Sequence, residues 1–490
     1  MTDHEVVIGL EVHSQLLTRS KMYCSCSSDY QDAGPNTVVC EVCMGMPGVL
    51  PVVNRRAVEL VIATGLALDC TISENTKFDR KNYPYPDLMK GYQISQYDEP
   101  VALGGRLGVE VDGHETTIGI TRVHLEEDTA RLLHRDGPNG GYSLLDVNRA
   151  GVPLMEIVSE PDIRSPEEAR SYLTTLHTIL RYIGVSTANM EEGSFRCDAN
   201  ISIRPVGDEE LGTKVEVKNM NSFRSVYNAL RFESERQTRL AAEGGRIVQE
   251  TRGWVDERGV TVSQRIKEGV DDYRYFPEPD LPPIVIERGW IEEVRGRLPE
   301  LPTARRSRYI DDYGLSDYDA RLLTASKATA DFFEAALLSR PLEGEALEKA
   351  AKSVGNWVLG ELARLLNTSG ESVDQARFEP GQLMELLELV DAGTLSTGMA
   401  RTVFEEMFET GAPPKRIAEE RGLVQISDAD AVQPAVVEAV SDNPGPVADY
   451  LAGKEVAMKF LVGQVMKITR GKANPQLVAE MLKDKLESMR

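Results

Sequence analysis

The sequence predicts an α+β protein in which an antiparallel-sheet domain is followed by an all-α domain and a small helical tail. Several segments up to about residue 288 alternate strictly between apolar and polar residues, which is typical of half-buried strands. From about residue 290 the apolar spacing becomes helical, and a third region begins near residue 411. We therefore expect domains at residues 1–293, 294–408 and 409–490.

Five segments of the first domain are expected to be strands with an apolar back and a charged front. Side chains alternate across a strand with a period of two, so Glu11 and His13 share one face and stand roughly 7 Å apart. Alternation also places Glu126 on such a face, while a bulge at the strand end can turn Glu127 inward instead. The candidate catalytic residues on this face are Glu11, His13, Glu126, Glu127, Glu156 and Asp198.

This charged face predicts phosphoryl-transfer chemistry on the sheet itself. Neighbouring carboxylates repel one another and persist where a cation holds them, and oxygen ligands with one imidazole suit Mg²⁺ or Mn²⁺ better than zinc. A divalent metal beside Arg and Lys is what a transferring phosphoryl group needs. The sequence has no P-loop and no G-x-G-x-x-G opening a helix, so an ATP site would be sheet-based. The candidate ATP and phosphate-binding residues are Arg122, Arg196, Arg204, Lys214 and Lys218.

A plainer interpretation of this face stays open. An antiparallel sheet usually has one solvated face, and charge alone does not distinguish that case from a site. The composition favours a site, because the face gathers His, Asn, Asp, Glu and Arg rather than scattered Thr, Lys and Glu.

Four cysteines after the first strand predict a structural zinc site. Their arrangement is C-x-C followed by C-x-x-C, and two close pairs can converge on one tetrahedral ion. Four thiolates leave no open coordination position, which argues against a catalytic zinc. A disulfide or redox role is the alternative, although nothing else in the sequence indicates secretion. The zinc ligands would be Cys24, Cys26, Cys40 and Cys43.

The tail carries the best basic patch of an acidic chain. Its candidate RNA-binding residues are Lys459, Lys467, Arg470 and Lys472, with Lys454 nearby; the alternative is a solvated helix face. Asn474 followed by Pro475 predicts the start of the last helix. An apolar stripe follows in that helix: Leu477, Val478, Met481, Leu482 and Leu486.

The composition restricts the class of protein. The net charge of −23 argues against a general nucleic-acid coat protein but not against a locally basic RNA site. We expect no signal peptide and no membrane-spanning helix, and hence a cytoplasmic protein without membrane or DNA partners. The excess acid is compatible with a salt-rich cytoplasm and equally with an ordinary acidic cytosolic enzyme.

Several motifs along the whole chain resemble those of GatB, the B subunit of the tRNA-dependent amidotransferases. They occur at residues 8–13 (IGLEVH), 78–83 (FDRKNY), 92–96 (YQISQ), 124–128 (HLEED), 148–151 (NRAG), 156–162 (EIVSEPD), 191–200 (EEGSFRCDAN), 218–223 (KNMNSF), 272–280 (DYRYFPEPD), 463–467 (GQVMK) and 471–475 (GKANP). Together these motifs are highly specific. The four cysteines place the chain among the members of the family that have the zinc site.

The resemblance implies a cradle-shaped catalytic domain of the glutamine-synthetase type, a helical domain and a YqeY-like tail that binds tRNA. It implies a ligase that uses ATP and Mg²⁺ to phosphorylate the aminoacyl carboxylate of Asp-tRNA(Asn), Glu-tRNA(Gln) or both. Ammonia from glutamine then displaces the phosphate. The implied partners are the tRNA acceptor arm and two further components of a heterotrimer, the glutaminase (A) and a small protein (C). The implied magnesium ligands are Glu11, His13, Glu127, Glu156 and Asp198, with Glu126 kept as the alternative to Glu127.

The amide-forming step requires neutral ammonia in a place shielded from water, which argues for an enclosed passage beside the acyl phosphate. Lys81, Tyr83 and Asp87, in a loop fixed by prolines, are the expected lining of that passage. Two other functions remain as alternatives: a zinc-stabilised RNA-binding scaffold without catalysis, and a free-standing carboxylate–amine ligase acting on small molecules.

Overall fold

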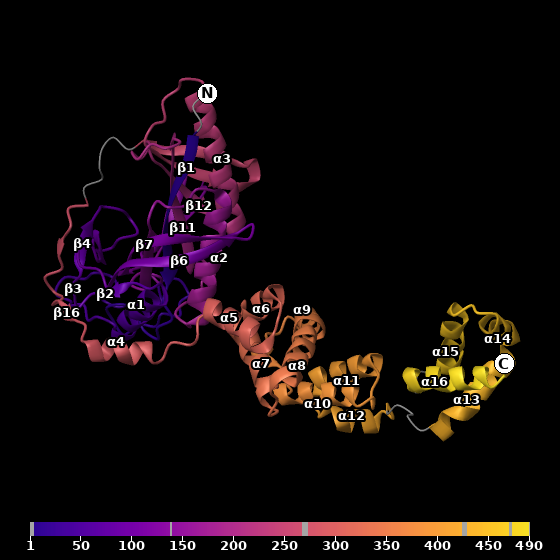
Figure 1. Ribbon diagram of the computed structural model, residues 1–490. Helices are drawn as coiled ribbons and strands as arrows, with labels where there is room; N and C mark the ends of the chain where they lie inside the picture. The colour runs from indigo at the N-terminus through magenta and orange to yellow at the C-terminus, as the bar shows by residue number, and fades with distance from the viewer. Residues whose placement is uncertain (1–3, 138–139, 267–272, 424–428, 470–472, 490) are drawn as a thin grey trace. The chain divides into compact units, whose positions relative to one another are not determined.

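The computed structural model describes residues 4–137, 140–266, 273–423, 429–469 and 473–489. Contacts between residues divide the chain into two compact units, 1–301 and 302–490. The division falls within the proline-containing segment 298–303. The first unit is a mixed α/β structure with a large, mostly antiparallel sheet, and the second is helical (Figure 1).

The large sheet has nine strands, and the chain's first strand lies at its centre. The spatial order is β14-β13-β12-β11-β1-β10-β7-β6-β2, and only the β12–β13 pair is parallel. The strands are β1 (His4–Gln15), β2 (Thr71–Ile72), β6 (Ala102–Val111), β7 (His114–Glu127), β10 (Pro153–Ser159), β11 (Phe195–Pro205), β12 (Val215–Met220), β13 (Glu250–Val255) and β14 (Val260–Ile266). All five predicted strands are therefore present and belong to this one sheet.

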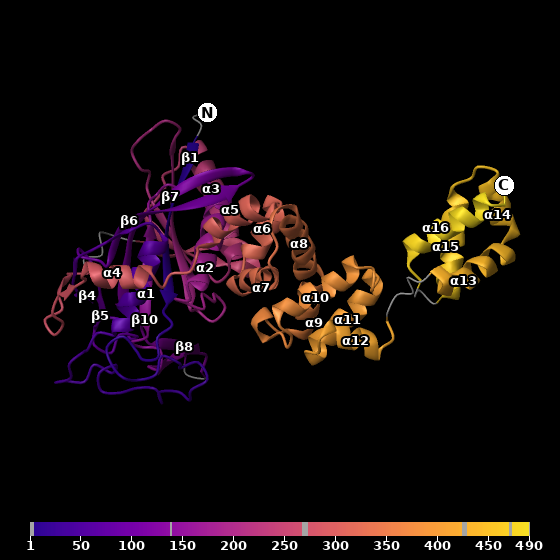
Figure 2. The same cartoon turned by 60° about the horizontal axis from the view of Figure 1, so that its bottom comes forward.

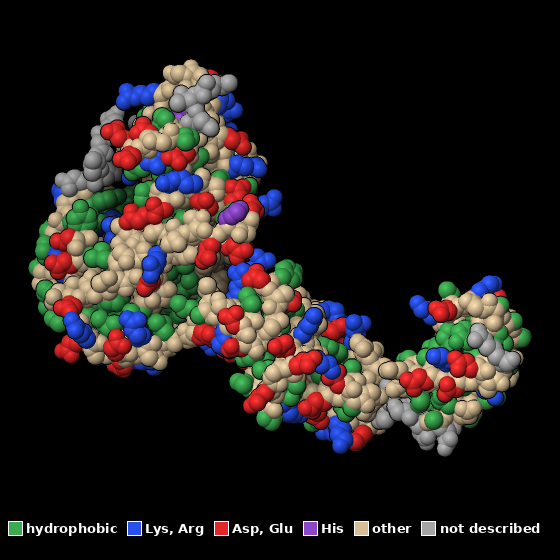
Figure 3. All heavy atoms as spheres, in the orientation of Figure 1, with side chains coloured by type: hydrophobic (Ala, Val, Ile, Leu, Met, Phe, Trp, Pro, Cys, Tyr) green, Lys and Arg blue, Asp and Glu red, His purple; other side chains and the backbone are tan. Residues whose placement is uncertain are grey.

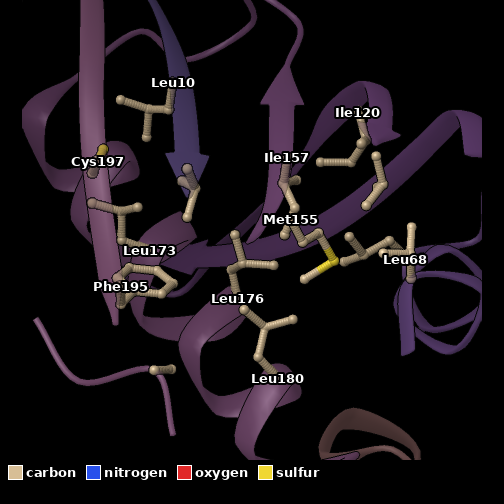
Figure 4. Packing of buried hydrophobic residues seen from close by; sticks show 14 of the residues in the cluster. Leu10, Leu68, Ile120, Met155, Ile157, Leu173, Leu176, Leu180, Phe195 and Cys197 are labelled. Atoms are coloured by element: carbon tan, nitrogen blue, oxygen red, sulfur yellow. The ribbon is translucent and has the colours of Figure 1, made fainter. Parts of the chain in front are cut away.

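Three helices cover the apolar face of the sheet: α1 (Arg55–Ala67), α2 (Pro166–Tyr182) and α3 (Phe223–Ala242). Figure 4 shows Leu176 of α2 next to Met155 of β10, and Leu173 of the same helix beside Phe195 of β11. Leu173, Leu176 and Leu180 of α2 are fully buried, as are Met155 and Ile157 of β10. The apolar face of the sheet and the apolar stripe of the helix therefore form one core.

Helix α2 begins where its sequence predicts. Pro166 occupies the first turn, and the Ser165 hydroxyl accepts a hydrogen bond from the backbone N–H of Glu168 at 3.1 Å, which satisfies one otherwise unpaired donor. Helix α4 (Arg288–Arg295) packs beside α1 (Figure 2), with the Arg55 guanidinium 4.8 Å from the centre of the Trp290 ring.

Small sheets complete the first unit. One joins β15 (Phe276–Pro277), β4 (Asp79–Asn82) and β5 (Tyr92–Ser95), and two others pair β16 (Ile284–Val285) with β3 (Asn75–Thr76) and β8 (Arg131–Arg135) with β9 (Tyr142–Asp146). Glu278 anchors the first of these sheets, because Arg80 of β4 donates two hydrogen bonds of 2.7 Å to its carboxylate.

The second unit contains two apolar clusters. The first is formed within residues 309–423 and the second within residues 432–486. The helices are α5 (Pro302–Tyr313), α6 (Asp317–Thr324), α7 (Lys327–Leu338), α8 (Gly344–Trp357), α9 (Ala363–Ser369), α10 (Pro380–Asp391), α11 (Thr397–Thr410), α12 (Pro414–Glu420), α13 (Ala429–Asp442), α14 (Pro444–Leu451), α15 (Val456–Ile468) and α16 (Pro475–Glu487), with a π-helical turn at Val358–Leu362.

The start of the last helix agrees with the prediction. The Asn474 side chain accepts hydrogen bonds from the N–H groups of Gln476 and Leu477, and Pro475 follows it in the first turn. Within the apolar stripe of α16, Val478, Leu482 and Leu486 are fully buried. None of the helices in the described ranges combines the length and the hydropathy needed to cross a lipid bilayer.

Candidate active site and cysteine cluster

The sheet register brings the predicted acidic residues onto adjacent positions of neighbouring strands. On β1, Glu11 lies opposite Asp198 of β11, and His13 lies opposite Glu156 of β10. Glu156 in turn lies opposite His124 of β7. The alternation of side chains therefore places these groups on the face opposite the apolar core.

Two histidines and two glutamates form the centre of this face. The Glu156 Oε2 atom is 3.3 Å from the Nε2 atoms of both His13 and His124. The Glu126 carboxylate lies 3.7 Å from His13 and 3.8 Å from His124, and it accepts a hydrogen bond of 3.1 Å from the Ser95 hydroxyl. One ligand atom each from His13, Glu126 and Glu156 lies within 4.8 Å of the others, a spacing that fits one metal ion.

Burial and charge both act on these groups. Burial opposes protonation of His124, but Glu156 and Glu126 outweigh it and raise the pKa of His124 to about 9. Burial also opposes protonation of His13, whose pKa is nevertheless raised by Glu156 and Glu126. Although burial would raise the pKa of Glu156, the two imidazoles lower it well below its usual value. The cluster therefore keeps its carboxylates ionised at neutral pH.

A second group of charges continues along β1, β11 and β12. The Lys218 ammonium donates a hydrogen bond of 2.7 Å to Asp198 and lies 3.3 Å from Glu216. The Asn200 amide donates a hydrogen bond of 2.9 Å to Glu11. Glu11 and Asp198 thus lie in the same face as the histidine cluster but outside the three-ligand group.

A buried aspartate holds one of the candidate phosphate-binding arginines. Asp128 follows β7, and its carboxylate accepts hydrogen bonds of 2.9 Å from Arg196 and 2.8 Å from Gln15. Arg149 lies 3.6 Å from the same carboxylate. Burial works against the charge of Asp128, but Arg196 and Arg149 lower its pKa below the usual value. The Arg196 guanidinium is therefore fixed at the edge of the cluster.

A cavity of about 880 Å³ is lined by most of these groups. Its lining includes Glu11, His13, His124, Glu126, Glu156, Asp198, Arg122, Arg196, Lys214 and Lys218. The three residues predicted for an ammonia passage, Lys81, Tyr83 and Asp87, line the same cavity. The structure thus brings together most of the predicted residues. Lys81, which was expected in a loop, lies on β4, and Tyr83 and Asp87 follow that strand.

Lys81 faces the carboxylates across this cavity. Burial opposes its charge, but Glu126, Tyr275 and Glu156 raise its pKa above the usual value. Its ammonium lies 5.1 Å from the centre of the Tyr273 ring. A lysine held in its charged form here can neutralise an anion bound between the aromatic wall and the sheet.

Two predicted residues lie outside the cavity lining. Arg204 sits at the far end of β11, where it donates a hydrogen bond of 2.6 Å to Glu5. Glu127 points away from Glu126, forms an ion pair with Lys90, and accepts a hydrogen bond of 2.9 Å from the Ile94 N–H. Of the two alternative glutamates, the structure places Glu126 in the site.

The four predicted zinc ligands form a separate cluster. The Sγ atoms of Cys24, Cys26, Cys40 and Cys43 all lie within 4.8 Å of one another, and all four cysteines are free thiols. The Cys40 N–H donates a hydrogen bond of 3.0 Å to the Cys43 sulfur, a contact that favours a thiolate. This donor set suits a tetrahedral, soft-ligand metal site.

The cysteine cluster borders a second, smaller cavity of about 120 Å³, here called the cysteine-side cavity. Cys24 and Cys43 line it together with Tyr23, Lys90 and Glu127. Adjacent residues at the end of β7 therefore serve two different spaces, because Glu126 lines the large cavity and Glu127 lines the cysteine-side cavity.

His124 shares the reactive face with Glu126 but was not among the predicted site residues. The signal was its spacing, since His124 and Glu126 are two residues apart on one strand. Tyr273 and Tyr275 belong to the motif at residues 272–280 but were not among the predicted site residues, and both line the large cavity. No local pattern predicts that a segment so far along the chain returns to this face.

The predicted basic residues of the tail differ in their surroundings. Lys459 and Lys467 are exposed on α15, whereas the Lys454 ammonium donates a hydrogen bond of 2.8 Å to Asp449. Arg470 and Lys472 lie outside the described residues. Figure 3 shows that acidic and basic side chains are interspersed on the visible face of the helical unit.

Comparisons with known proteins match both units. A family model described as the GatB/GatE catalytic domain matches residues 6–292, and a second model, described as the GatB domain, matches residues 343–486. A protein of Dehalococcoides mccartyi is 57% identical over 490 residues, which cover 99% of this chain and 100% of that relative. A protein of Carboxydothermus hydrogenoformans is 53% identical over 492 residues, covering 100% of both chains. A third, from Moorella thermoacetica, is 55% identical and covers 99% of this chain and 100% of its own.

All three relatives are named as the B subunit of an aspartyl/glutamyl-tRNA(Asn/Gln) amidotransferase. The resemblance found in the sequence motifs is thereby confirmed along the full length of the chain. This chain belongs to the family of the aspartyl/glutamyl-tRNA(Asn/Gln) amidotransferase B subunits.

Proposed function

We propose that this chain is the part of a tRNA-dependent amidotransferase that converts misacylated Asp-tRNA(Asn), Glu-tRNA(Gln) or both into Asn-tRNA(Asn) and Gln-tRNA(Gln). It is a ligase that forms a carbon–nitrogen bond with glutamine as amido donor. The observation that carries this proposal is the large cavity, in which a metal-binding group of two carboxylates and an imidazole lies beside several fixed cations. The relatives' shared name supplies the substrate class.

The first step is phosphorylation of the aminoacyl side chain. A carboxylate oxygen of the Asp or Glu attached to the tRNA attacks the terminal phosphorus of ATP, and ADP leaves. His13, Glu126 and Glu156 would hold Mg²⁺, which neutralises charge on the phosphate oxygens when it is bound. Arg196 and Lys218 stabilise the charge that develops on the transferring group.

The second step is amide formation. Ammonia attacks the acyl carbon, the bond to the phosphate oxygen breaks, and a proton is lost from the nitrogen. We propose that Lys81, Tyr83 and Asp87 line the end of the passage that delivers ammonia. The Asp87 carboxyl supports a role in a water-poor place, because burial raises its pKa above the usual value.

The finer architecture and the partners belong to the same proposal. We assign residues 1–293 to a cradle domain of the glutamine-synthetase type, 294–408 to a helical domain and 409–490 to a YqeY-like tail. The four thiolates hold a structural Zn²⁺. The protein works in the cytoplasm as a heterotrimer with the glutaminase (A) and the small protein (C). Its tail contacts tRNA through exposed lysines such as Lys459 and Lys467.

The test is ATP-dependent phosphate release by the chain purified together with the glutaminase and the small third protein of the heterotrimer. Release should depend on Mg²⁺ and on Asp-tRNA(Asn) or Glu-tRNA(Gln), each supplied separately. Glu11→Ala and Asp198→Ala should abolish release while tRNA binding persists, and the exposed Glu115→Ala serves as the matched control. A chain that binds tRNA but never consumes ATP would be a scaffold. Turnover that survives deletion of residues 411–490, with small carboxylates as substrates, would indicate a free-standing ligase.

A further inference from the structure

A short hairpin stands at the edge of the large cavity and has no role in the proposed chemistry. It consists of β8 and β9, which among the described strands pair only with each other. Strand β8 begins just after Thr129, which lines the large cavity. The Thr129 hydroxyl donates a hydrogen bond of 2.9 Å to Asp87, another residue of that lining. The base of the hairpin is therefore part of the cavity's edge.

The base of the hairpin is fixed to the body of the first unit. Arg149, which follows β9, donates hydrogen bonds of 2.9 Å to the carbonyl oxygens of Thr129 and Ala130, which precede β8. The Asn148 side chain is buried and accepts a hydrogen bond of 2.9 Å from the Val38 N–H, in the loop between the two cysteine pairs. An isolated two-stranded hairpin is only marginally stable, so these bonds hold it in place.

Asn36, in the same loop, adds an anchor at the end of β9. Its backbone has a φ of 57°, in the left-handed region that Asn tolerates better than most residues. The Asn36 amide donates a hydrogen bond of 3.1 Å to the Leu145 carbonyl oxygen, and its side-chain oxygen accepts one of 2.7 Å from the Val147 N–H. The loop that joins the cysteine pairs thus supports the hairpin from one side.

One face of the hairpin combines positive charge with exposed apolar surface. Tyr142 and Leu144 on this face are 54% and 49% exposed. Asp146 is already engaged, because its carboxylate accepts hydrogen bonds from the N–H groups of Asn36 and Asn148. The cross-strand register places six side chains on the face: Arg131, Leu133, Arg135, Tyr142, Leu144 and Asp146.

The two arginines of this face carry charge that the described part of the chain does not neutralise. Arg131 and Arg135 are exposed, and neither forms an ion pair with a carboxylate of a described residue; Arg135 donates a hydrogen bond of 3.3 Å to the His134 carbonyl oxygen. In a chain with a net charge of −23, two such arginines beside a cavity favour an anionic partner. Four residues of strand separate them by about 13 Å, so they can contact different phosphates of one nucleic-acid strand.

The chemistry of the face fits unpaired nucleotides. Unstacked RNA bases bind to aromatic rings and guanidinium planes, and neighbouring cations bind the backbone. The proposed substrate also brings unpaired nucleotides to this place, because the amino acid is esterified to the last nucleotide of the single-stranded 3′ end of a tRNA. That end must cross the edge of the large cavity for the aminoacyl carboxylate to reach the metal-binding group.

We propose that the β8–β9 hairpin holds the single-stranded 3′ end of the tRNA at the edge of the large cavity. Tyr142 stacks on an unpaired base, and Arg131 and Arg135 contact phosphates. This inference rests on the proposed function, which supplies the tRNA substrate. It adds an RNA contact in the first unit, separate from the lysines of the tail.

The test compares RNA hairpins with and without a single-stranded 3′ end, made with the acceptor-stem sequences of tRNA(Asn) and tRNA(Gln). Binding to the full chain is measured by fluorescence anisotropy over a range of salt concentrations. Wild-type protein should bind the RNA with the 3′ end at least about tenfold more tightly. Replacing both Arg131 and Arg135 by Ala should reduce this preference to below about threefold and the slope of log affinity against log salt by about 1–2.

Two Tyr142 variants separate stacking from the presence of a side chain. Tyr142→Ala should weaken binding of the RNA with the 3′ end about fivefold or more, whereas Tyr142→Phe keeps the ring and should bind normally. Arg224→Ala is the matched control for the arginines, because it removes an exposed arginine from α3, which covers the opposite face of the sheet. All the substituted hairpin side chains are exposed, so the variants should keep the wild-type melting temperature.

The outcomes distinguish this inference from the proposed function. If wild-type protein shows no preference for the 3′ end, or if folded arginine and Tyr142→Ala variants keep that preference, the assignment is overturned. Equal losses for both kinds of RNA overturn it as well. Variants that bind RNA normally but no longer co-purify with the glutaminase would show that the face docks a protein instead. The proposed function itself fails if wild-type protein binds neither intact Asp-tRNA(Asn) nor Glu-tRNA(Gln).

Discussion

Asp128 offers the sharpest test of how the site is held together. Its side chain is 1% exposed, and it is the shared partner of Arg196, Arg149 and Gln15. Asp128→Asn keeps the shape but removes the charge, and one of its two oxygens becomes an amide donor facing other donors. Two cations then remain beside a neutral group in the protein interior.

The expected loss of stability follows from these surroundings. Removing one partner of a buried ion pair costs about 3–5 kcal/mol. The Arg196 side chain is 37% exposed, so solvent screens part of that cost and we expect about 2–3 kcal/mol. For a unit of about 300 residues the loss corresponds to a fall of about 3–5 °C in the melting temperature.

The measurement is thermal unfolding of the full chain at pH 7, with the exposed Asp136→Asn as control, which should stay within about 1 °C of wild type. The pH dependence gives a second criterion. Because the folded pKa of Asp128 is lowered, its stabilisation is fully present above the unfolded pKa of about 3.9 and is lost as the pH falls through the folded value. If the Asp128→Asn variant melts at the same temperature as the wild-type protein, the reasoning is refuted. It is also refuted if the difference in melting temperature between wild type and variant grows as the pH is lowered toward 4.

Three further outcomes are expected. Cys43→Ser should reduce bound zinc from about one equivalent to a small fraction, as measured by elemental analysis, and normal zinc content would exclude the four-thiolate site. Leu176→Ala, at a fully buried position of α2, should cost about 3–4 kcal/mol in urea unfolding, and a loss below about 1 kcal/mol would mean that the core collapses around the gap. Glu126→Gln should weaken Mg²⁺ binding by at least about tenfold, whereas Glu127→Gln, which removes only the ion pair with Lys90, should weaken it clearly less; the reverse order would assign the metal to the other glutamate.

Alternation in the sequence was enough to predict which side chains share the reactive face. The prediction succeeds because the other face of the sheet packs against an apolar core. A shift of one residue in the strand register would bury Glu11 or Glu156 among leucines. The same argument favoured Glu126 over Glu127, but both stayed open because a bulge at the strand end can turn Glu127 inward. The cysteine cluster was equally predictable, because its four ligands lie close together along the chain, between Cys24 and Cys43.

The sequence could not predict how far along its strand each side chain lies from the site, nor which strands are neighbours in the sheet. Arg204 and Arg196 share a face of β11, but eight residues of strand separate them by about 27 Å, and only Arg196 reaches the cavity. The contact of His124 with Glu156 depends on β10 lying between β1 and β7, and that strand order is set by long-range pairing.

The end of β7 separates the large cavity from the cysteine-side cavity, and a single strand forms the wall between them. Glu126 and Glu127 are consecutive, so any rotation of that peptide moves both carboxylates in opposite directions at once. The ion pair of Glu127 with Lys90 then acts as a brace that holds Glu126 against the histidines. A change in the cysteine-side cavity that weakens this ion pair would therefore shift Glu126 in the large cavity, although no other side chain of one cavity needs to contact a side chain of the other.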